Sequence, residues 1–362
     1  MGRTLRPKQV PHRLIVGHVP WVFRFSRHGG LQVTTQAYNA KVNRDRGAMN
    51  LVKLIEEFAD EKKCRTFLEK LRWSDGVRCP RCGRDNPKRI SSVTRYRRDT
   101  ADGLHKKGEI RGEREQFDCS CGYQFSVTTG TVFHDTHLPL WKWFLATYLT
   151  AEAKKGVSAN QLKRTLGVSY ETAWFLSHRI RSAMEQIDRP LAGVVELDET
   201  YVGGKAKGKG KKGGYGHKVM VMGALERDGD IRLRVSTSKS RGRTIQRFAN
   251  SVLGDGVDVV YTDGHNAYKG LQDVPHEVVD HSSEEWVRGD VSTQGIENAW
   301  SLLKRSIVGS YHQLSAKHLQ AYADEFAFRF NNRDNPYLFR DALLKLCEAN
   351  ALPYETLTHP AP

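Results

Sequence analysis

The sequence has no long apolar run and few cysteines. Of its 362 residues 39% are hydrophobic, and no stretch approaches the roughly 20 apolar residues that a membrane-spanning helix needs. Six cysteines are too few for a disulfide scaffold in so long a chain, and four of them fall in two close pairs. These shortages exclude membrane-spanning and disulfide-stabilised proteins. They predict a cytoplasmic protein, without a membrane partner, that binds a metal ion.

Acidic residues are also scarce relative to basic ones. The 41 Asp and Glu residues face 57 Lys and Arg residues, which gives a formal net charge of +16 and an isoelectric point near 9.6. Such an excess of positive charge repels itself unless phosphates or solvent accommodate it, so the composition indicates a polyanionic partner. A basic protein of ribosomal type is the alternative. The length predicts two or three domains.

Residues 1–48 are rich in Arg, Lys, Gly and His and show no clear periodicity. We interpret them as a disordered extension, and expect a chain that begins at Met49 to be as stable and active as the whole. Helical spacing begins there: Leu54 and Phe58 belong to one predicted short helix, and Phe67 and Leu71 to the next.

Two cysteine pairs follow within a predicted domain over residues 49–135. Cys79 and Cys82 form a C-x-x-C pair before Gly83, a turn that brings two thiolates to one tetrahedral zinc ion, and Cys119 and Cys121 offer the second pair. Alternating aromatic residues flank the second pair, which favours a zinc ribbon with structural Zn²⁺. The charged stretch between the pairs is either a β-hairpin over DNA or a solvated loop. It contains His105, an alternative ligand that is more simply an exposed loop residue.

Residues 136–190 have a helical pattern. In SANQLKRTLGVSYETAWFLSHRI, Ser158 is a predicted N-cap, and two short helices flank a turn at Gly167, which is typical of a helix-turn-helix. Its predicted DNA contacts are base readers at the start of the second helix and phosphate contacts further along: Tyr170, Glu171 and Thr172, then His178, Arg179 and Arg181. A helical bundle that only links two domains is the alternative.

Beyond Pro190 the pattern changes to strands. VVELDETYVGGK, then KVMVMGALERDGDIRLRVSTS with a hairpin turn at Asp228, predict three antiparallel strands. A helix near RTIQRFANSVL and the strand VDVVYTDG follow, and this last strand is most simply a parallel neighbour of the first, reached by that crossover helix. This order predicts an RNase H-like mixed α/β domain over residues 191–334. The fold class is therefore α+β and multidomain.

Three acidic side chains complete a predicted catalytic site in this domain. Asp198 and Asp263 lie at the ends of hydrophobic strands, and Glu297 lies in the helix GIENAWSLLKR. Strand-Asp, strand-Asp and helix-Glu can hold two Mg²⁺ or Mn²⁺ ions for phosphodiester chemistry. At about 100° per residue, Lys304 shares a helix face with Glu297, whereas Asn298 points about a quarter turn away. We therefore predict Glu297 as the third ligand and Lys304 as a phosphate contact, with Asn298 as the alternative ligand.

The remaining segments carry weaker signals. The glycine-rich segment after the first strand does not precede a helix, which argues against nucleotide binding, and its Lys205, Lys207 and Lys209 are either a flexible arm for the DNA backbone or a solvated loop. Later aromatic residues at helical spacing favour core packing: Tyr322, Phe326 and Phe330. Residues 335–362 predict a last amphipathic helix and a tail, packed on the catalytic domain. Cys64 and Cys347 are predicted core residues.

Seven motifs in this order resemble one family: LRWSDGVRCPRCG, QFSVTTGTVFHDTHLPLWKWF, SYETAWFLSHRIR, ELDETYVGGK, YTDGHNAY, IENAWSLLKR and EFAFRFNNR. The chain is similar to bacterial insertion-sequence transposases of the DDE superfamily, in the zinc-ribbon group called ISXO2-like and related to Merlin elements. The resemblance implies an RNase H-like catalytic domain, divalent-metal chemistry and recognition of element ends. Two features depart from the family: the second cysteine pair is one residue short, and Ser292 to Gln294 stand where His-Thr-Asn is usual.

These observations predict a DNA transposase that binds the ends of its insertion sequence and catalyses metal-dependent strand cleavage and strand transfer. Its partners would be double-stranded DNA, as terminal inverted repeats and as target, and further copies of the chain assembled on that DNA. Such a protein would associate with the nucleoid. A DNA-binding regulator without catalysis, or a nuclease that only cleaves, are the alternatives.

Overall fold

The computed structural model describes residues 48–95, 106–108, 110–186, 189–203, 218–236, 238, 241–271, 274–279, 287–312 and 314–359, together with four short strands near the N-terminus. The chain divides into two compact units, Met1–Ala48 and Met49–Pro362. In the first, β1 (Ile15–Val16) pairs with β2 (Val19–Pro20) and β3 (Phe23–Phe25) with β4 (Leu31–Val33), both antiparallel. The disorder predicted for the rest of this segment lies outside the described residues. None of the described helices has the length and apolar character of a membrane span.

The second unit begins with the two predicted helices and a zinc ribbon. Asn50 caps α3 (Leu51–Phe58) and Asp60 caps α4 (Glu61–Arg72), each through a side-chain oxygen that accepts a backbone N–H. A three-stranded sheet in the order β5-β6-β7 follows, made of β5 (Lys88–Arg95), β6 (Ile110–Asp118) and β7 (Gln124–Phe125). The β5–β6 pair is the hairpin alternative predicted for the stretch between the cysteine pairs. Residues 96–105 lie outside the described part.

A helical core follows the ribbon, built on α5 (Leu140–Glu152), α6 (Ala159–Leu166) and α7 (Tyr170–Ala183). Ser158 caps α6, Gly167 ends it with a positive φ of 60°, and Ser169 caps α7, so the predicted pair of helices and its turn are present. The last long helix, α11 (Leu338–Glu348), also packs here, against α4, α5 and α7. The expectation that this helix packs on the catalytic domain was wrong, because its apolar face joins the helical core.

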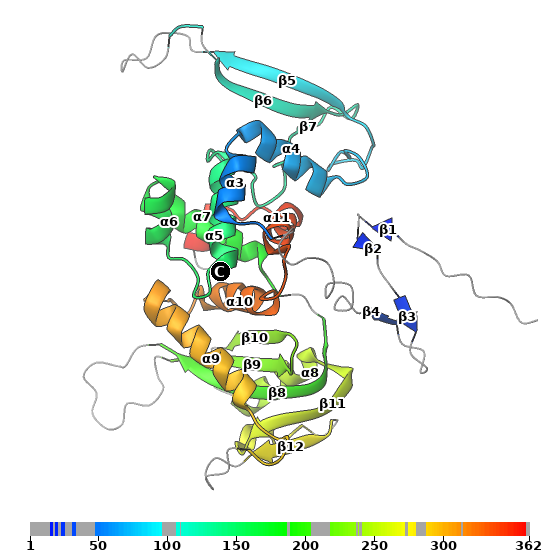
Figure 1. Cartoon of the computed structure of the whole chain (residues 1–362), viewed down its shortest axis with the longest axis vertical. Helices are drawn as coiled ribbons and strands as arrows, with labels where there is room; N and C mark the ends of the chain where they lie inside the picture. Colours follow the sequence, from blue (N-terminus) through cyan, green and yellow to red (C-terminus); the bar gives the residue numbers. More distant parts are fainter. Residues whose placement is uncertain are drawn as a thin grey trace, which may run out of the picture. The chain divides into compact units, whose positions relative to one another are not determined.

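The predicted catalytic domain contains a five-stranded mixed sheet in the order β10-β9-β8-β11-β12 (Figure 1). Its strands are β8 (Leu191–Val202), β9 (Val219–Glu226), β10 (Ile231–Ser236), β11 (Leu253–Asp263) and β12 (His276–Val279). The first three form an antiparallel meander, and β11 lies parallel to β8, as the sequence predicted. Between β10 and β11 runs the crossover helix α8 (Arg241–Val252). The short parallel strand β12 was not predicted.

Helices cover both faces of the sheet. On one face, Ile245 and Phe248 of α8 share a core with β8, β9 and the short helix η1 (Asn266–Tyr268). The other face carries α9 (Gln294–Ser306), which continues into the π-helical turn η3 (Ile307–Tyr311), and α10 (Leu319–Asn331). Phe326 is buried there, with Phe330 partly buried against the same core, so the predicted core role of these two aromatics is confirmed. The chain ends with α12 (Tyr354–Thr358).

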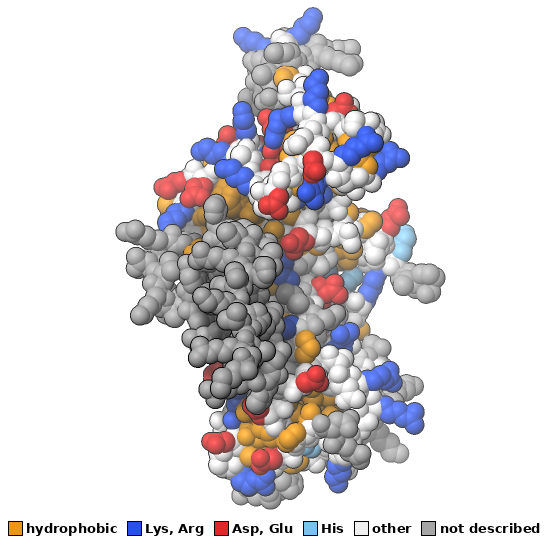
Figure 2. Space-filling view, turned by 90° about the vertical axis from the view of Figure 1, so that its right-hand side faces the viewer, with side chains coloured by type: hydrophobic (Ala, Val, Ile, Leu, Met, Phe, Trp, Pro, Cys, Tyr) orange, Lys and Arg blue, Asp and Glu red, His pale blue; other side chains and the backbone are white. Residues whose placement is uncertain are grey.

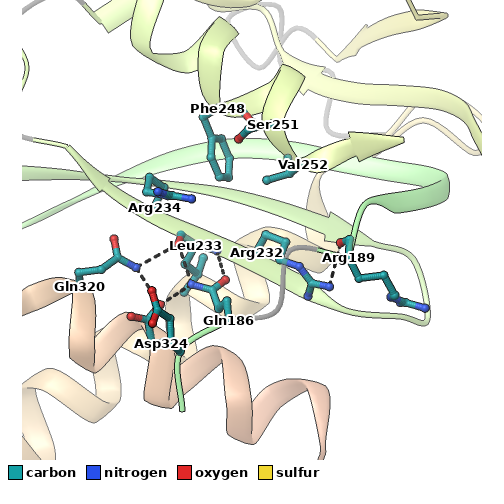
Figure 3. A pocket seen from close by; sticks show the side chains of 11 residues that line it. Gln186, Arg189, Arg232, Leu233, Arg234, Phe248, Ser251, Val252, Gln320 and Asp324 are labelled. Carbon is teal, nitrogen blue, oxygen red and sulfur yellow. Dashed lines mark hydrogen bonds between the residues drawn. The ribbon is translucent and has the colours of Figure 1, made fainter. Parts of the chain in front are cut away.

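Side-chain amides cover the outer edge of β10. Gln186 accepts the N–H of Leu233 at 2.7 Å and donates to its carbonyl at 2.8 Å (Figure 3). Gln320 accepts the N–H of Val235, and Asn331 pairs with both backbone groups of Ile231. The groove beside these amides has a volume of about 480 Å³ and is bordered by α8 and α10. Every second residue of this strand thus has its outward backbone N–H bonded to a side chain.

Candidate functional site

Strand register places the two predicted catalytic aspartates side by side. In the parallel pair of β8 and β11, Val260 lies opposite Val195 and Thr262 opposite Leu197, so Asp263 and Asp198 occupy the next level. Because side chains alternate along a strand, Asp198 points to the same face as Glu196, which is the face that α9 covers. Asp263 ends its strand, and its Oδ1 accepts the backbone N–H of His265 at 3.1 Å.

Trp300 of α9 connects the helix to this pair. Its indole Nε1 donates to Asp198 Oδ2 at 2.8 Å, and its ring lies over Gly223, the residue of β9 opposite Asp198. A Cβ atom at Gly223 would lie 2.6 Å from the Trp300 ring, closer than side chains pack. Glycine at this position therefore lets α9 approach the sheet closely enough to reach Asp198.

The surroundings of Asp198 favour its protonated form. Burial raises its pKa and the Trp300 hydrogen bond opposes this, while the negative charges of Asp263 and Glu297 raise it further and Lys304 lowers it, with a net value of about 7. The predicted acids and the predicted lysine thus lie within electrostatic reach of Asp198. Three carboxylates around one partly buried position are hard oxygen donors of the kind that bind Mg²⁺ or Mn²⁺. The donor types fit a divalent cation, but among the described residues only the four cysteines have ligand atoms close enough together for one ion, so the metal site of these acids stays a prediction.

Glu297 lies at the start of α9, where Thr293 Oγ1 donates to its Oε1 at 2.9 Å. Its side chain and those of Asn298 and Lys304 are exposed. The charges of Glu297 and Lys304 both act on Asp198, in keeping with a shared helix face for these two residues. Asn298 carries no charge, so the choice between Glu297 and Asn298 as third ligand remains a prediction.

An ion pair beside these acids, between a buried glutamate and a partly exposed arginine, was missed in the sequence. Glu196, 2% exposed, accepts the backbone N–H of Ile296 at 2.9 Å and the Nε of Arg227 at 3.0 Å. Arg227 also donates to the carbonyl and hydroxyl oxygens of Ser292. Ser292 belongs to the segment that departs from the family pattern, so this residue contributes to holding the start of α9. Alternation along β8 could have placed Glu196 on the face of Asp198, but nothing in the sequence pairs it with Arg227.

The four cysteines of the ribbon converge. Sγ of Cys79 and Cys121 are 3.8 Å apart, and those of Cys82 and Cys119 are 3.6 Å apart. All four sulfurs lie within 4.8 Å of one another, and no other His, Cys, Asp or Glu residues in the described part gather as tightly. A tetrahedral zinc ion with bonds of about 2.3 Å requires sulfurs about 3.8 Å apart, so the cluster fits zinc.

The shorter second cysteine pair keeps this geometry by a tighter turn. Gly83 donates its N–H to the carbonyl of Cys79, four residues back, whereas Gly122 donates to Cys119, three residues back. Both glycines have positive φ, 72° and 76°. The shorter spacing therefore changes the backbone turn, while the sulfur atoms keep positions suitable for one zinc ion. His105, the alternative ligand, lies outside the described residues.

The predicted DNA contacts of α7 divide into two groups. Tyr170, Glu171 and Thr172 are exposed at its first turn. His178, Arg179 and Arg181 are 2%, 6% and 2% exposed, and the prediction that they contact phosphates was wrong. Every residue from Leu176 to Arg181 is buried, so this part of the helix is enclosed on all sides by the protein. Lys205, Lys207 and Lys209 lie outside the described residues.

The three buried residues, His178, Arg179 and Arg181, interact with other parts of the protein. Arg181 forms an ion pair with Glu325, and Arg179 donates to the carbonyl oxygen of His134. Burial lowers the pKa of His178 to about 3, helped by Arg181 and His318. These three side chains hold α7 in the protein.

Comparison with known proteins gives two matches to family models. Residues 59–124 match a transposase zinc-ribbon domain, and residues 190–331 match an ISXO2-like transposase domain. The second range contains Asp198, Asp263, Glu297 and Lys304, and the first contains all four cysteines of the cluster.

Among individual proteins, the chain is 29% identical over 294 residues to an uncharacterized protein in transposable element ISH50 of Halobacterium salinarum. The match covers 76% of this chain and 92% of that protein. Among solved structures, a simian T-cell lymphotropic virus intasome in complex with PP2A regulatory subunit B56 gamma aligns with 12% identity and a TM-score of 0.24. That alignment covers 61% of this chain and 74% of the other.

Proposed function

We propose, on the premise that the chain belongs to the ISXO2-like transposases, that it binds the ends of its insertion sequence, cuts DNA strands there and joins them to target DNA. The observation that carries this proposal is the environment of Asp198, where burial and the charges of Asp263 and Glu297 raise the pKa to about 7. A carboxylate that is buried beside two other acids is costly to ionise unless cations neutralise it, and strongly perturbed acids cluster at functional sites.

Asp198, Asp263 and Glu297 would hold the ions, Mg²⁺ or Mn²⁺. Two divalent cations bound there would supply an activated water or 3′-hydroxyl nucleophile and stabilise the leaving oxygen of the displacement. Trp300 holds the Asp198 carboxylate in one orientation, and the Glu196–Arg227 pair fixes the start of the helix that bears Glu297. Lys304 would bind a DNA phosphate beside the acids.

DNA would be bound by surfaces in three parts of the chain. The first turn of α7 exposes Tyr170, Glu171 and Thr172 for base contacts, in the manner of a second helix of a helix-turn-helix. Lys and Arg side chains lie on the described surface of the zinc ribbon in the upper part of Figure 2, interspersed with acidic, apolar and uncharged groups. Lys205, Lys207 and Lys209 follow the catalytic strand directly in sequence and would contact the backbone. Joining two element ends would require more than one copy of the chain on the DNA.

Incubation with labelled DNA tests the proposal. The purified protein is mixed with donor DNA that carries the inverted repeats flanking its gene, with a target plasmid and with Mg²⁺ or Mn²⁺. Joined donor–target products that require the cation and vanish in Asp263→Asn are expected. Nicked donor without joined products would indicate a nuclease, and binding without nicking would indicate a regulator; either result would contradict the proposal.

A further inference from the structure

A buried ionic cluster lies outside the catalytic site. Glu325 is 0% exposed and accepts hydrogen bonds from Arg181 Nε at 2.5 Å, Arg329 Nε at 3.2 Å and Tyr311 Oη at 2.5 Å. Arg181 is 2% exposed and also stacks on the ring of Tyr322 at 4.0 Å. Burial opposes ionisation of Glu325, but the two arginines outweigh it and lower its pKa below the usual value.

The members of this cluster come from separate parts of the chain. Arg181 belongs to α7, whose first turn is the proposed base reader. Glu325 and Arg329 belong to α10, which lies between the helical core and the sheet in Figure 1. Tyr311 ends the π-helical turn that continues α9, the helix of Glu297. One buried carboxylate thus bonds directly to the DNA-reading helix and to the extension of the catalytic helix.

The loop that leads into α6 closes over the same cluster. Arg329 Nη1 donates to the carbonyl oxygens of Ala153 and Lys154, both at 3.0 Å. A Cβ atom at Gly156 would lie 1.7 Å from Tyr311 Oη and 2.9 Å from Glu325 Oε1. Only a glycine backbone fits there. The helix pair α6–α7 is therefore fixed at the entry loop and at Arg181.

The catalytic helix is held at both ends. Its first turn bonds to Glu196 of the sheet through Ile296, and its continuation bonds to Glu325 through Tyr311. Isolating an ion pair from water costs several kcal/mol, so apolar residues would stabilise this core at least as well. Unlike apolar contacts, the hydrogen bonds to Glu325 depend on distance and angle. All of them form together in only one arrangement of α7, α10 and the continuation of α9.

We propose that Glu325 is a positioning residue that fixes the DNA-reading helix α7 relative to the catalytic helix α9 and so sets which phosphate is cut. The inference rests on the proposed function, because it concerns where along a bound element end the strand is cleaved. The distance between a bound sequence and the cleaved bond then depends on the hydrogen bonds of Tyr311 and Arg181 to Glu325.

The test maps cleavage positions at nucleotide resolution. A linear duplex carrying the inverted repeat beside the gene and its flanking DNA, labelled at one end, is cut with Mn²⁺ and resolved on a denaturing gel. Tyr311→Phe removes one hydrogen bond to Glu325 and no charge, and Tyr337→Phe makes the same chemical change outside the cluster. Glu325→Gln removes the charge, and circular dichroism and thermal melting show whether it folds.

The wild type and Tyr337→Phe should cut at one phosphate. Tyr311→Phe should bind the duplex as the wild type does and keep total nicking within about threefold of the wild type. Its cuts should spread over neighbouring phosphates, because the distance between the DNA-reading helix and the catalytic helix is no longer fixed. A folded Glu325→Gln should spread them further. A purely structural role would reduce yield or total nicking without moving the cut.

Cutting by Tyr311→Phe at the single wild-type phosphate would overturn this inference and leave the proposed function standing. Absence of cutting by the wild type, with the duplex bound, would overturn the proposed function and this inference together.

Discussion

Trp300 donates its indole N–H to Asp198 at 2.8 Å, while its ring occupies the space that a side chain at Gly223 would fill. The hydrogen bond stabilises the carboxylate form of Asp198 against burial and against two neighbouring acids. Trp300, to which no sequence motif assigned a role, thereby orients Asp198, a candidate metal ligand.

Replacement of Trp300 by Phe should reduce cleavage about tenfold at pH 7, because a hydrogen bond to a charged group stabilises by roughly 1.5–3 kcal/mol. The pKa of Asp198 rises further when this donor is lost, so more of the carboxyl is protonated and fewer cations bind. Cleavage should recover as the pH is raised to about 8.5, because the Asp198 carboxyl loses its proton once the pH exceeds its raised pKa. Trp141→Phe, at a partly exposed position of α5, is the control. A loss that does not recover with pH would contradict the explanation.

The third ligand can be identified by alanine substitution along α9. Glu297→Ala should abolish cleavage and retain DNA binding, because a carboxylate oxygen is lost from the site. Asn298→Ala is its neighbour and matched control and should retain measurable cleavage, while Lys304→Ala should raise KM by weakening phosphate contact. An inactive Asn298→Ala beside an active Glu297→Ala, both folded, would reverse the assignment.

The cysteine cluster should hold close to one equivalent of zinc in the purified protein, as structural sites do. Cys79→Ser should lose most of this zinc, unfold the ribbon and weaken binding to element ends, while the catalytic domain stays folded. Cys64→Ser removes a buried thiol outside the cluster, one that donates to the carbonyl of Phe58, and should keep its zinc. Wild-type protein with less than about half an equivalent would refute zinc ligation by the cluster.

His178 should make the protein sensitive to mild acid. Its pKa falls from 6.5 in the unfolded chain to about 3 in the folded one, so its contribution to stability is complete above pH 6.5 and is lost as the pH falls toward 3. Between pH 7 and pH 5 this amounts to about 2 kcal/mol. His178→Phe should therefore lose less stability over that interval in urea titrations. His137→Phe, at an exposed position, should lose as much as the wild type, and equal losses in both variants would contradict this role.

The sheet was predictable because its strands have strong local signals. Hydrophobic runs of period two end at Asp198 and Asp263, a turn at Asp228 separates two of them, and the crossover rule leaves little choice of order. The zinc ribbon was predictable for a similar reason, since paired cysteines have few other uses in such a chain.

The partners of charged side chains were not predictable. Arg181 and Glu325 lie 144 residues apart in sequence, and periodicity says only that a helix has an inner face, not which acid meets it. Basic residues on α7 were therefore assigned to phosphates although they are buried. The same limit applies to α11, whose apolar face suits the sheet and the helical core equally well until the tertiary contacts are known.

The amides on the outer edge of β10 bear on how copies of the chain can meet. A strand edge with free N–H and C=O groups is a template onto which a strand of another molecule can add, which produces open-ended aggregates. Gln186, Gln320 and Asn331 occupy both groups at Ile231 and Leu233 and the N–H of Val235. A second subunit therefore cannot extend the catalytic sheet from this side without displacing them, and copies gathered on DNA would have to associate through other surfaces.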